Sequence, residues 1–155
     1  MRNRVMLLAF VAAMGLAIGT YGLLAQSLEN AAIEQLMRQI TDVYNKKDLA
    51  TYEKICDPKV LIMEEGVKTV GWVAVRDVTV KEWESLTDFN WDVGIIQVHF
   101  VGKNFAWATS EGSFKGKMKD GTQSQGPVME SCIFQKKSGA WKLVHAHYSS
   151  LPMQK

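Results

Sequence analysis

Three histidines are the first candidates for chemistry, because two of them lie two residues apart near the end of the chain. Alternate residues of a β-strand share a face, so we expect Trp141, Leu143, His145 and His147 to point the same way. With His99, the pair could form a three-histidine zinc site that leaves one coordination position open for water. The alternative is a set of hydrogen-bonded histidines on a sheet face or in a dimer contact. We favour this alternative and predict no metal site and no cofactor.

Two glutamates are candidates for acid–base chemistry. Glu111 and Glu130 flank Asp120-Gly121, a dipeptide that is typical of a hairpin turn. Symmetry about that turn places the two carboxylates nearly opposite one another on paired strands. If both faced a cavity, their proximity would raise the pKa of one, and they could act as an acid–base pair. The alternative is that they are ordinary solvated strand residues.

Polar and aromatic side chains on otherwise apolar strands are expected to line one cavity. Alternation puts Trp107, Thr109 and Glu111 on a common face, and it pairs Glu130 with Cys132 in the same way. The predicted catalytic residues are a base and a polarising donor, chosen from Glu111, Glu130, His147 and Tyr148. The predicted ligand-binding residues are Tyr44, Trp107, Thr109 and Cys132.

The elements that must position these residues follow from hydrophobic periodicity. The spacing predicts a helix over 27–47, and Asp48 can cap a short second helix that stops at Asp57-Pro58. Residues 71–86 favour a strand by their valine content, but their apolar face and their glutamates indicate a third helix. Strands are predicted at 60–63, 89–100, 105–117, 128–136 and 140–150. Segregated helices and an antiparallel meander indicate the α+β class in one domain.

The N-terminus carries the pattern of an export signal. Arg2 and Arg4 precede an uncharged apolar stretch that extends to Ala25. We therefore predict a signal peptide over 1–25, a domain over 26–155, and a periplasmic or secreted protein. The alternative is an uncleaved membrane anchor, because about 20 apolar residues can span a bilayer. The membrane is an expected partner only in that case.

Charge and cysteine content restrict the possible partners. Residues 1–25 hold two of the 18 basic and none of the 16 acidic side chains, so the remainder is formally neutral. A formally neutral domain lacks the excess positive charge that binds the phosphate backbone, so nucleic acid is not expected as a partner. Cys56 and Cys132 could form a disulfide in an exported protein, but we favour two unpaired thiols.

The order of the elements and three motifs resemble the nuclear transport factor 2-like superfamily, especially its SnoaL-like branch. The motifs are a helical entry at 44–58, a glycine-led helix from Gly71, and a closing strand that ends in His145, His147, Ser149 and Pro152. The resemblance implies a strongly bent, cystatin-like antiparallel sheet wrapped around three N-terminal helices as a cone with an internal cavity. It also implies a homodimer that associates through the sheet.

Three kinds of relative suggest different functions. Ketosteroid isomerase-like members use an aspartate where this chain has Met63 and a tyrosine near Gln39 or Ile40, so isomerase activity of that kind is not expected. The association domain of calcium/calmodulin-dependent kinase II and the iota-class carbonic anhydrases share the closing pattern. The leading prediction is a domain that binds a small, largely apolar molecule, with possible proton-transfer chemistry. The alternatives are a non-catalytic oligomerisation module and a carbonic anhydrase.

Overall fold

The computed structural model describes residues 25–150 of the chain, which divides into two compact units, residues 1–32 and 33–155. In the first unit, residues 25–32 are helical. The predicted export signal or anchor at 1–25 therefore lies, except for its last residue, outside the described residues, as does Pro152. Within residues 25–150, no helix is both long and apolar enough to cross a membrane.

The second unit contains the remaining helical segments. Residues 33–46 are helical, followed by α2 (Leu49–Ile55) and α3 (Trp72–Ser85). Asp48 caps α2 as predicted, because its carboxylate accepts a hydrogen bond of 3.0 Å from the Thr51 amide. The first segment buries one stripe of apolar side chains at helical spacing: Ile33, Met37, Ile40 and Tyr44.

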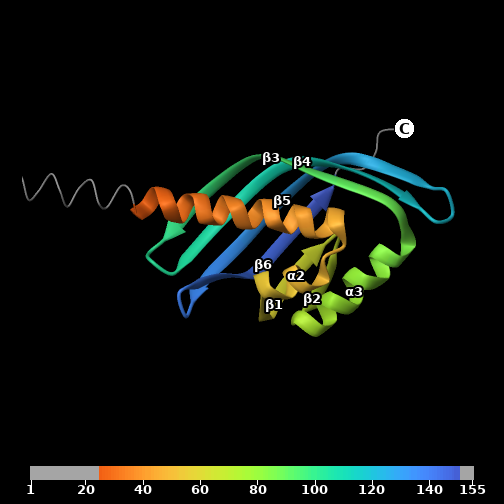
Figure 1. Cartoon of the computed structure of the whole chain (residues 1–155). Coiled ribbons are helices and arrows are strands. Elements are labelled where there is room, and N and C mark those ends of the chain that lie inside the picture. Colours follow the sequence, from red (N-terminus) through yellow and green to blue (C-terminus); the bar gives the residue numbers. More distant parts are fainter. Residues whose placement is uncertain (1–24, 151–155) are drawn as a thin grey trace, which may run out of the picture. The chain divides into compact units, whose positions relative to one another are not determined.

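Six strands form one sheet in the order β2-β1-β6-β5-β4-β3. They are β1 (Cys56–Glu64), β2 (Val67–Val70), β3 (Leu86–Val101), β4 (Phe105–Met118), β5 (Gln123–Lys137) and β6 (Ala140–Ser150). Figure 1 shows the sheet of this unit curving around its helical segments. We call the face toward the helices the inner face and the opposite face the outer face. The predicted α+β class and bent sheet are confirmed, and one pair, β1 with β6, is parallel.

The edge strand β2 was not predicted from the sequence. It pairs with β1 across a tight turn in which Glu65 and Gly66 have φ values of 45° and 82°. Two successive residues with positive φ are typical of a hairpin turn that matches the twist of its strands. Glu65 and Gly66 therefore form the turn of a hairpin between β1 and β2.

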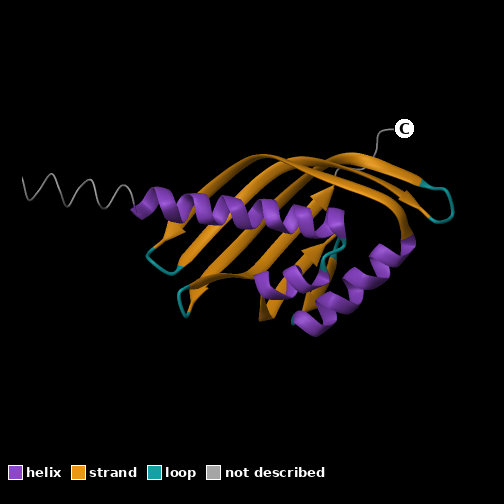
Figure 2. Cartoon of the chain, in the orientation of Figure 1, coloured by secondary structure: helices purple, strands orange, loops and turns teal. Residues whose placement is uncertain are grey.

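Irregularities in the pairing accompany the bend of the sheet. The register between β3 and β4 shifts between Val93 and Ile96, where β3 carries an extra residue. A Cβ atom at Gly112 would lie 2.3 Å from the Asp92 carbonyl oxygen, so only glycine permits this approach. Bulges increase local twist and bend a strand, which is how the long strands in Figure 2 can follow the helices.

Both cysteines are buried and unpaired, as favoured from the sequence. Burial raises the pKa of the Cys56 thiol to about 12, so this thiol stays neutral and packs as a small apolar group.

Candidate functional site

The alternation of β4 is opposite to the prediction for its cavity-lining residues. Ala106, Ala108 and Ser110 are buried on the inner face, so Trp107, Thr109 and Glu111 lie on the outer face. Trp107 is 41% exposed there and stacks on His99, with ring centroids 4.1 Å apart. Small residues face the helices and the large aromatic residue faces outward, which is why hydrophobicity suggested the wrong face. The structure does not bring these three residues to a cavity.

The two predicted acid–base glutamates are not paired. Glu130 is opposite Ser110, whereas Glu111 is opposite Met129. The turn holds an odd number of residues, because the amide of Met118 donates to the carbonyl of Thr122 around a three-residue connection. A two-residue turn at Asp120-Gly121 would have put the glutamates opposite each other. The difference of one residue places them on opposite faces of the sheet.

A bulge reverses the two faces of β6. The register with β5 shifts so that Leu143 pairs with Phe134 and His145 pairs with Ile133, which leaves Val144 as the extra residue. Leu143 is buried on the inner face before the bulge, and Ala146 and Tyr148 are buried there after it. His145 and His147 therefore lie on the outer face, and the expectation that they share a face with Trp141 and Leu143 is wrong. His147 is exposed, away from the predicted base.

The three histidines cannot share one metal ion in this sheet. His99 pairs with Trp107, Trp107 with Ile133, and Ile133 with His145, so three strand spacings separate the outer histidines. That separation is roughly 14 Å between backbones, whereas zinc requires its nitrogen ligands at about 2 Å. Within residues 25–150, no group of three ligating side chains is arranged to hold a metal.

The inner face carries a row of polar side chains across four strands. In the register, Ser110 is opposite Glu130, Glu130 is opposite Tyr148, and Tyr148 is opposite Glu64. The structure thus brings together Glu130, Cys132 and Tyr148 from the predicted set, on the face that the helices cover. The two ends of this row differ, because one is sealed in the core and the other opens to a cavity.

The sealed end is centred on Glu130, which is 3% exposed. The Ser110 hydroxyl donates to one of its carboxyl oxygens at 2.8 Å, and the Cys132 thiol donates to the other at 3.2 Å. Burial raises the pKa of Glu130, which favours the neutral carboxyl. The neighbouring Tyr148 hydroxyl is also buried and makes no hydrogen bond of acceptable geometry within the described chain.

The open end leads into two adjoining cavities of about 210 and 280 Å³. Both are lined by Tyr44 from the first helix, Glu64 from β1, Glu65 from the following turn, and Glu82 from α3. The smaller cavity has aromatic walls, and the larger is lined by apolar residues of β1, β2 and α3. We call the two together the carboxylate cavity. Of the predicted residues, Tyr44 and Tyr148 line it, and the Tyr148 hydroxyl has no hydrogen-bond partner among residues 25–150.

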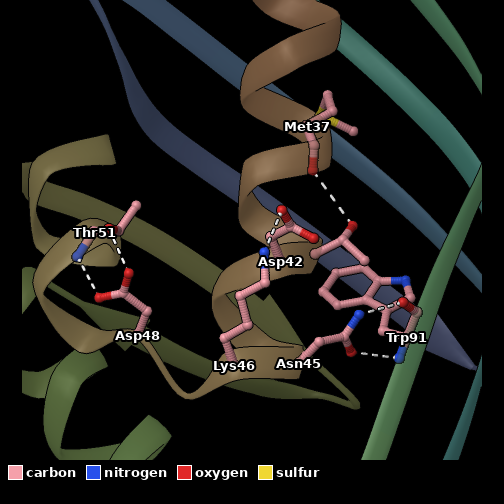
Figure 3. A network of polar contacts seen from close by, with 8 residues as sticks. Met37, Asp42, Asn45, Lys46, Asp48, Thr51 and Trp91 are labelled. Atoms are coloured by element: carbon pink, nitrogen blue, oxygen red, sulfur yellow. Dashed lines mark hydrogen bonds and ion pairs between the residues drawn. The ribbon is translucent and has the colours of Figure 1, made fainter.

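The aromatic wall consists of side chains held in edge contacts. Trp91 lies 5.5 Å from Tyr44 and 5.5 Å from Tyr148 between ring centroids, both in T-shaped geometry. Its backbone is fixed by Asn45, whose amide donates to the Trp91 carbonyl at 2.7 Å and accepts from the Trp91 amide at 2.6 Å (Figure 3). This two-bond contact ties the end of the first helix to β3 and holds the indole in the wall.

The carboxylates of the cavity have perturbed protonation. Burial and the nearby Glu64 raise the pKa of Glu82 to about 7. Burial and Glu65 likewise raise the pKa of Glu64. By contrast, the pKa of Glu65 is lowered, because its carboxylate accepts hydrogen bonds of 2.7 and 2.8 Å from the Ser150 amide and hydroxyl. Glu64 and Glu82 have no hydrogen-bonding or cationic partner for their carboxyl groups within residues 25–150.

Tyr44 lines both cavities together with Glu64 and Glu82 and contributes a phenol hydroxyl. Burial raises its pKa first, and the charges of Glu64 and Glu82 raise it further, so the phenol stays neutral and remains a donor. The two neighbouring carboxyls can accept and return a proton beside the apolar cavity. The neutral phenol can donate a hydrogen bond to negative charge on a ligand.

Glu64 and Glu82 were not among the predicted site residues, although both carry a local signal. Glu64 was set aside because it lies one residue from the isomerase base position at Met63 and so faces the opposite way. Glu64 continues the alternation of Val60 and Ile62, which points it to the inner face of β1. Glu82 lies three residues after Thr79, on the buried side of α3.

Comparison with known proteins identifies the family. The sequence model that describes the SnoaL-like domain matches residues 33–154. The chain belongs to the SnoaL-like domain family. It has the nuclear transport factor 2-like fold, as expected from the closing motif. No protein of curated function matches the chain.

Solved structures with the same fold differ widely in what they do. A nuclear transport factor 2-like protein from Salmonella enterica is 18% identical, with 84% of this chain and 96% of that chain covered and a TM-score of 0.75. A hexachlorocyclohexane dehydrochlorinase from Novosphingobium barchaimii is 15% identical over 81% and 88%, with a TM-score of 0.75. The association domain of calcium/calmodulin-dependent kinase II from Caenorhabditis elegans is 20% identical, with 81% of this chain and 98% of that chain covered and a TM-score of 0.66. At these identities the similarity shows the fold alone.

Proposed function

We propose that the carboxylate cavity of this SnoaL-like domain binds a small, largely apolar molecule and moves a proton on it. The observation that carries the proposal is the pair Glu64 and Glu82, two carboxyls beside an apolar cavity that have no hydrogen-bonding or cationic partner among residues 25–150. A pKa near 7 lets Glu82 exist in both protonation states at neutral pH, which suits a group that takes up and returns a proton. Glu64 is the base of the pair, and the neutral Tyr44 hydroxyl stabilises charge that develops on the substrate.

The size of the cavity limits the substrate. A cavity of roughly 150 Å³ accommodates a benzene-sized molecule, so about 210 Å³ suits a single substituted ring. The aromatic wall supplies apolar contact, and the carboxyls supply the polar groups that orient a ligand. A dehydrochlorinase among the structural neighbours supports the proposal by analogy only.

The experiment uses cyclohexanone as a probe, because exchange of its α-protons for deuterium reports proton abstraction directly. We expect the protein to accelerate exchange in D₂O as followed by proton NMR. Glu64→Gln should reduce the acceleration at least tenfold, since general base catalysis contributes about 10²- to 10⁴-fold. Glu111→Gln on the outer face is the matched control and should exchange at the wild-type rate. Binding without accelerated exchange would overturn the catalytic part of the proposal.

A second function, self-association, is favoured by the outer face. Four large apolar side chains from β1, β4 and β5 are between 38% and 55% exposed there: Met63, Trp107, Met129 and Ile133. Exposed apolar groups on one face suit contact with a second copy of the chain, and we propose a homodimer through this face, in an exported protein. Light scattering at micromolar concentration should give the mass of a dimer, and Trp107→Lys should shift it toward the monomer. A wild-type monomer would exclude the dimer.

A further inference from the structure

The charge of the carboxylate cavity is one-sided. Three glutamates line it, and no lysine, arginine or histidine does so among residues 25–150. Glu65 is stabilised by its two hydrogen bonds to Ser150, but Glu64 and Glu82 lack such bonds. Partly buried carboxylates normally have a cationic or hydrogen-bonding partner, because removing an ion from water is costly. Among residues 25–150, no side chain therefore compensates the carboxyl groups of Glu64 and Glu82 in this cavity.

The walls of the same cavity are suited to positive charge. Trp91, Tyr44 and Phe89 present aromatic rings, whose faces attract ammonium groups at distances up to about 6 Å. Trp91 is the strongest such group by chemical type, and Asn45 fixes its backbone. Aromatic side chains, together with carboxyls that have no partner among residues 25–150, distinguish this cavity from a purely apolar one, which would not favour a cation over a neutral ligand.

We propose that the ligand of the carboxylate cavity is a small organic cation, a protonated amine on a single-ring apolar body. The ring contacts the aromatic wall, and the ammonium group lies between Glu64 and Glu82. This inference rests on the proposed function for the site and adds the charge of its substrate. Burial and the charge of Glu64 raise the pKa of Glu82, and a cation bound between the two carboxyls opposes both effects, so binding expels a proton from Glu82.

Three probes of nearly equal size test the charge directly. Benzylamine is a cation at neutral pH, benzyl alcohol is neutral, and benzoate is an anion. At pH 8 we expect benzylamine to bind at least tenfold more tightly than benzyl alcohol, and benzoate to bind more weakly than either, as measured by NMR chemical-shift titration. Equal affinities for the amine and the alcohol, or tighter binding of benzoate, would overturn the cation while leaving an apolar ligand site intact. Failure of all three to bind would remove the ligand site and the proposed function with it.

Matched variants locate the effect. The double variant Glu64→Gln/Glu82→Gln keeps side-chain volume and removes both charges, so it should lose most of the preference for benzylamine and retain affinity for benzyl alcohol. Glu111→Gln removes one charge from the outer face and should preserve the preference. An unchanged preference in the double variant would show that the cation binds elsewhere and would overturn the assignment. Because replacing these repelling carboxyls relieves strain, the variants should fold, and a urea unfolding curve confirms it.

Discussion

Glu130 and Glu82 are both carboxyls with raised pKa values, but their surroundings differ in kind. Glu130 sits in the core with hydrogen bonds from Ser110 and Cys132, whereas Glu82 faces a cavity beside Glu64 and has no such partner in the described chain. A satisfied buried polar group stabilises its surroundings, and an unsatisfied one costs stability. A raised pKa alone therefore does not mark a functional site, because the partners of the group decide its role.

The first test of this comparison removes the satisfied carboxyl. Glu130→Ala should lower the free energy of unfolding by about 2–4 kcal/mol, because it leaves the Ser110 hydroxyl without its acceptor and creates a void in the core. Urea denaturation followed by tryptophan fluorescence measures the change. Glu130→Gln, which keeps the volume and one acceptor, should lose about 1 kcal/mol or less. If alanine costs no more than glutamine, the network around Glu130 contributes no stability and the contrast with Glu82 disappears.

The second test uses pH on Glu82, the half-buried carboxyl that faces the cavity. The pKa of Glu82 in the folded protein, about 7, lies above its model value of 4.5. The folded state therefore binds the proton more tightly, and this stabilisation is present below pH 4.5 and lost as pH rises through 7. Glutamine has no proton to lose, so Glu82→Gln should not show this loss. The free energy of unfolding of the variant, relative to wild type, should therefore rise by about 1–2 kcal/mol from pH 4 to pH 8, after allowance for partial exposure.

Urea titrations of Glu82→Gln and wild type at pH 4 and pH 8 measure this difference. Glu111→Gln is the control, because it changes the charge of an exposed side chain. The other titratable groups that line this cavity are Glu64, Glu65, Tyr44 and Tyr148, and burial keeps the pKa values of both tyrosines above this range. A difference between variant and wild type that is the same at both pH values would show that Glu82 titrates normally, and would remove it from the acid–base pair.

The sequence predicted the elements well because their signals are local. Capping at Asp48, the apolar stripe from Ile33 to Tyr44, and the turns between long strands each depend on neighbouring residues. It failed on which side of the sheet each residue faces, because that depends on counting residues through irregular points. One extra residue at Val144 moved His145 and His147 to the outer face, and a three-residue turn in place of two moved Glu111.

The residues of the candidate site could be predicted only in part from the sequence, because local patterns do not specify contacts between distant segments. Tyr44 was found because it continues the apolar stripe of a regular helix, whereas Tyr148 lies beyond the bulge of β6 and was assigned to the cavity through the resemblance to the kinase association domain. Glu64 and Glu82 become neighbours only when α3 packs against the end of β1, which is a contact between segments that no local pattern specifies. Their shared cavity was thus a property of the folded chain, even though each glutamate lies at an inward-facing position of its own element.

The smallest expected effect belongs to Glu111, the glutamate that the sequence placed in the cavity. It is exposed on the outer face opposite Met129, so Glu111→Gln should change the free energy of unfolding by no more than about 0.5 kcal/mol. It should also leave the pH dependence of stability and the binding of benzylamine unchanged, because the sheet separates this side chain from Glu64 and Glu82. Urea titrations and NMR titrations check both points together. A loss of ligand binding in this variant would mean that the outer face, and not the carboxylate cavity, holds the ligand, and the contrast between the two sides of the sheet would be reversed.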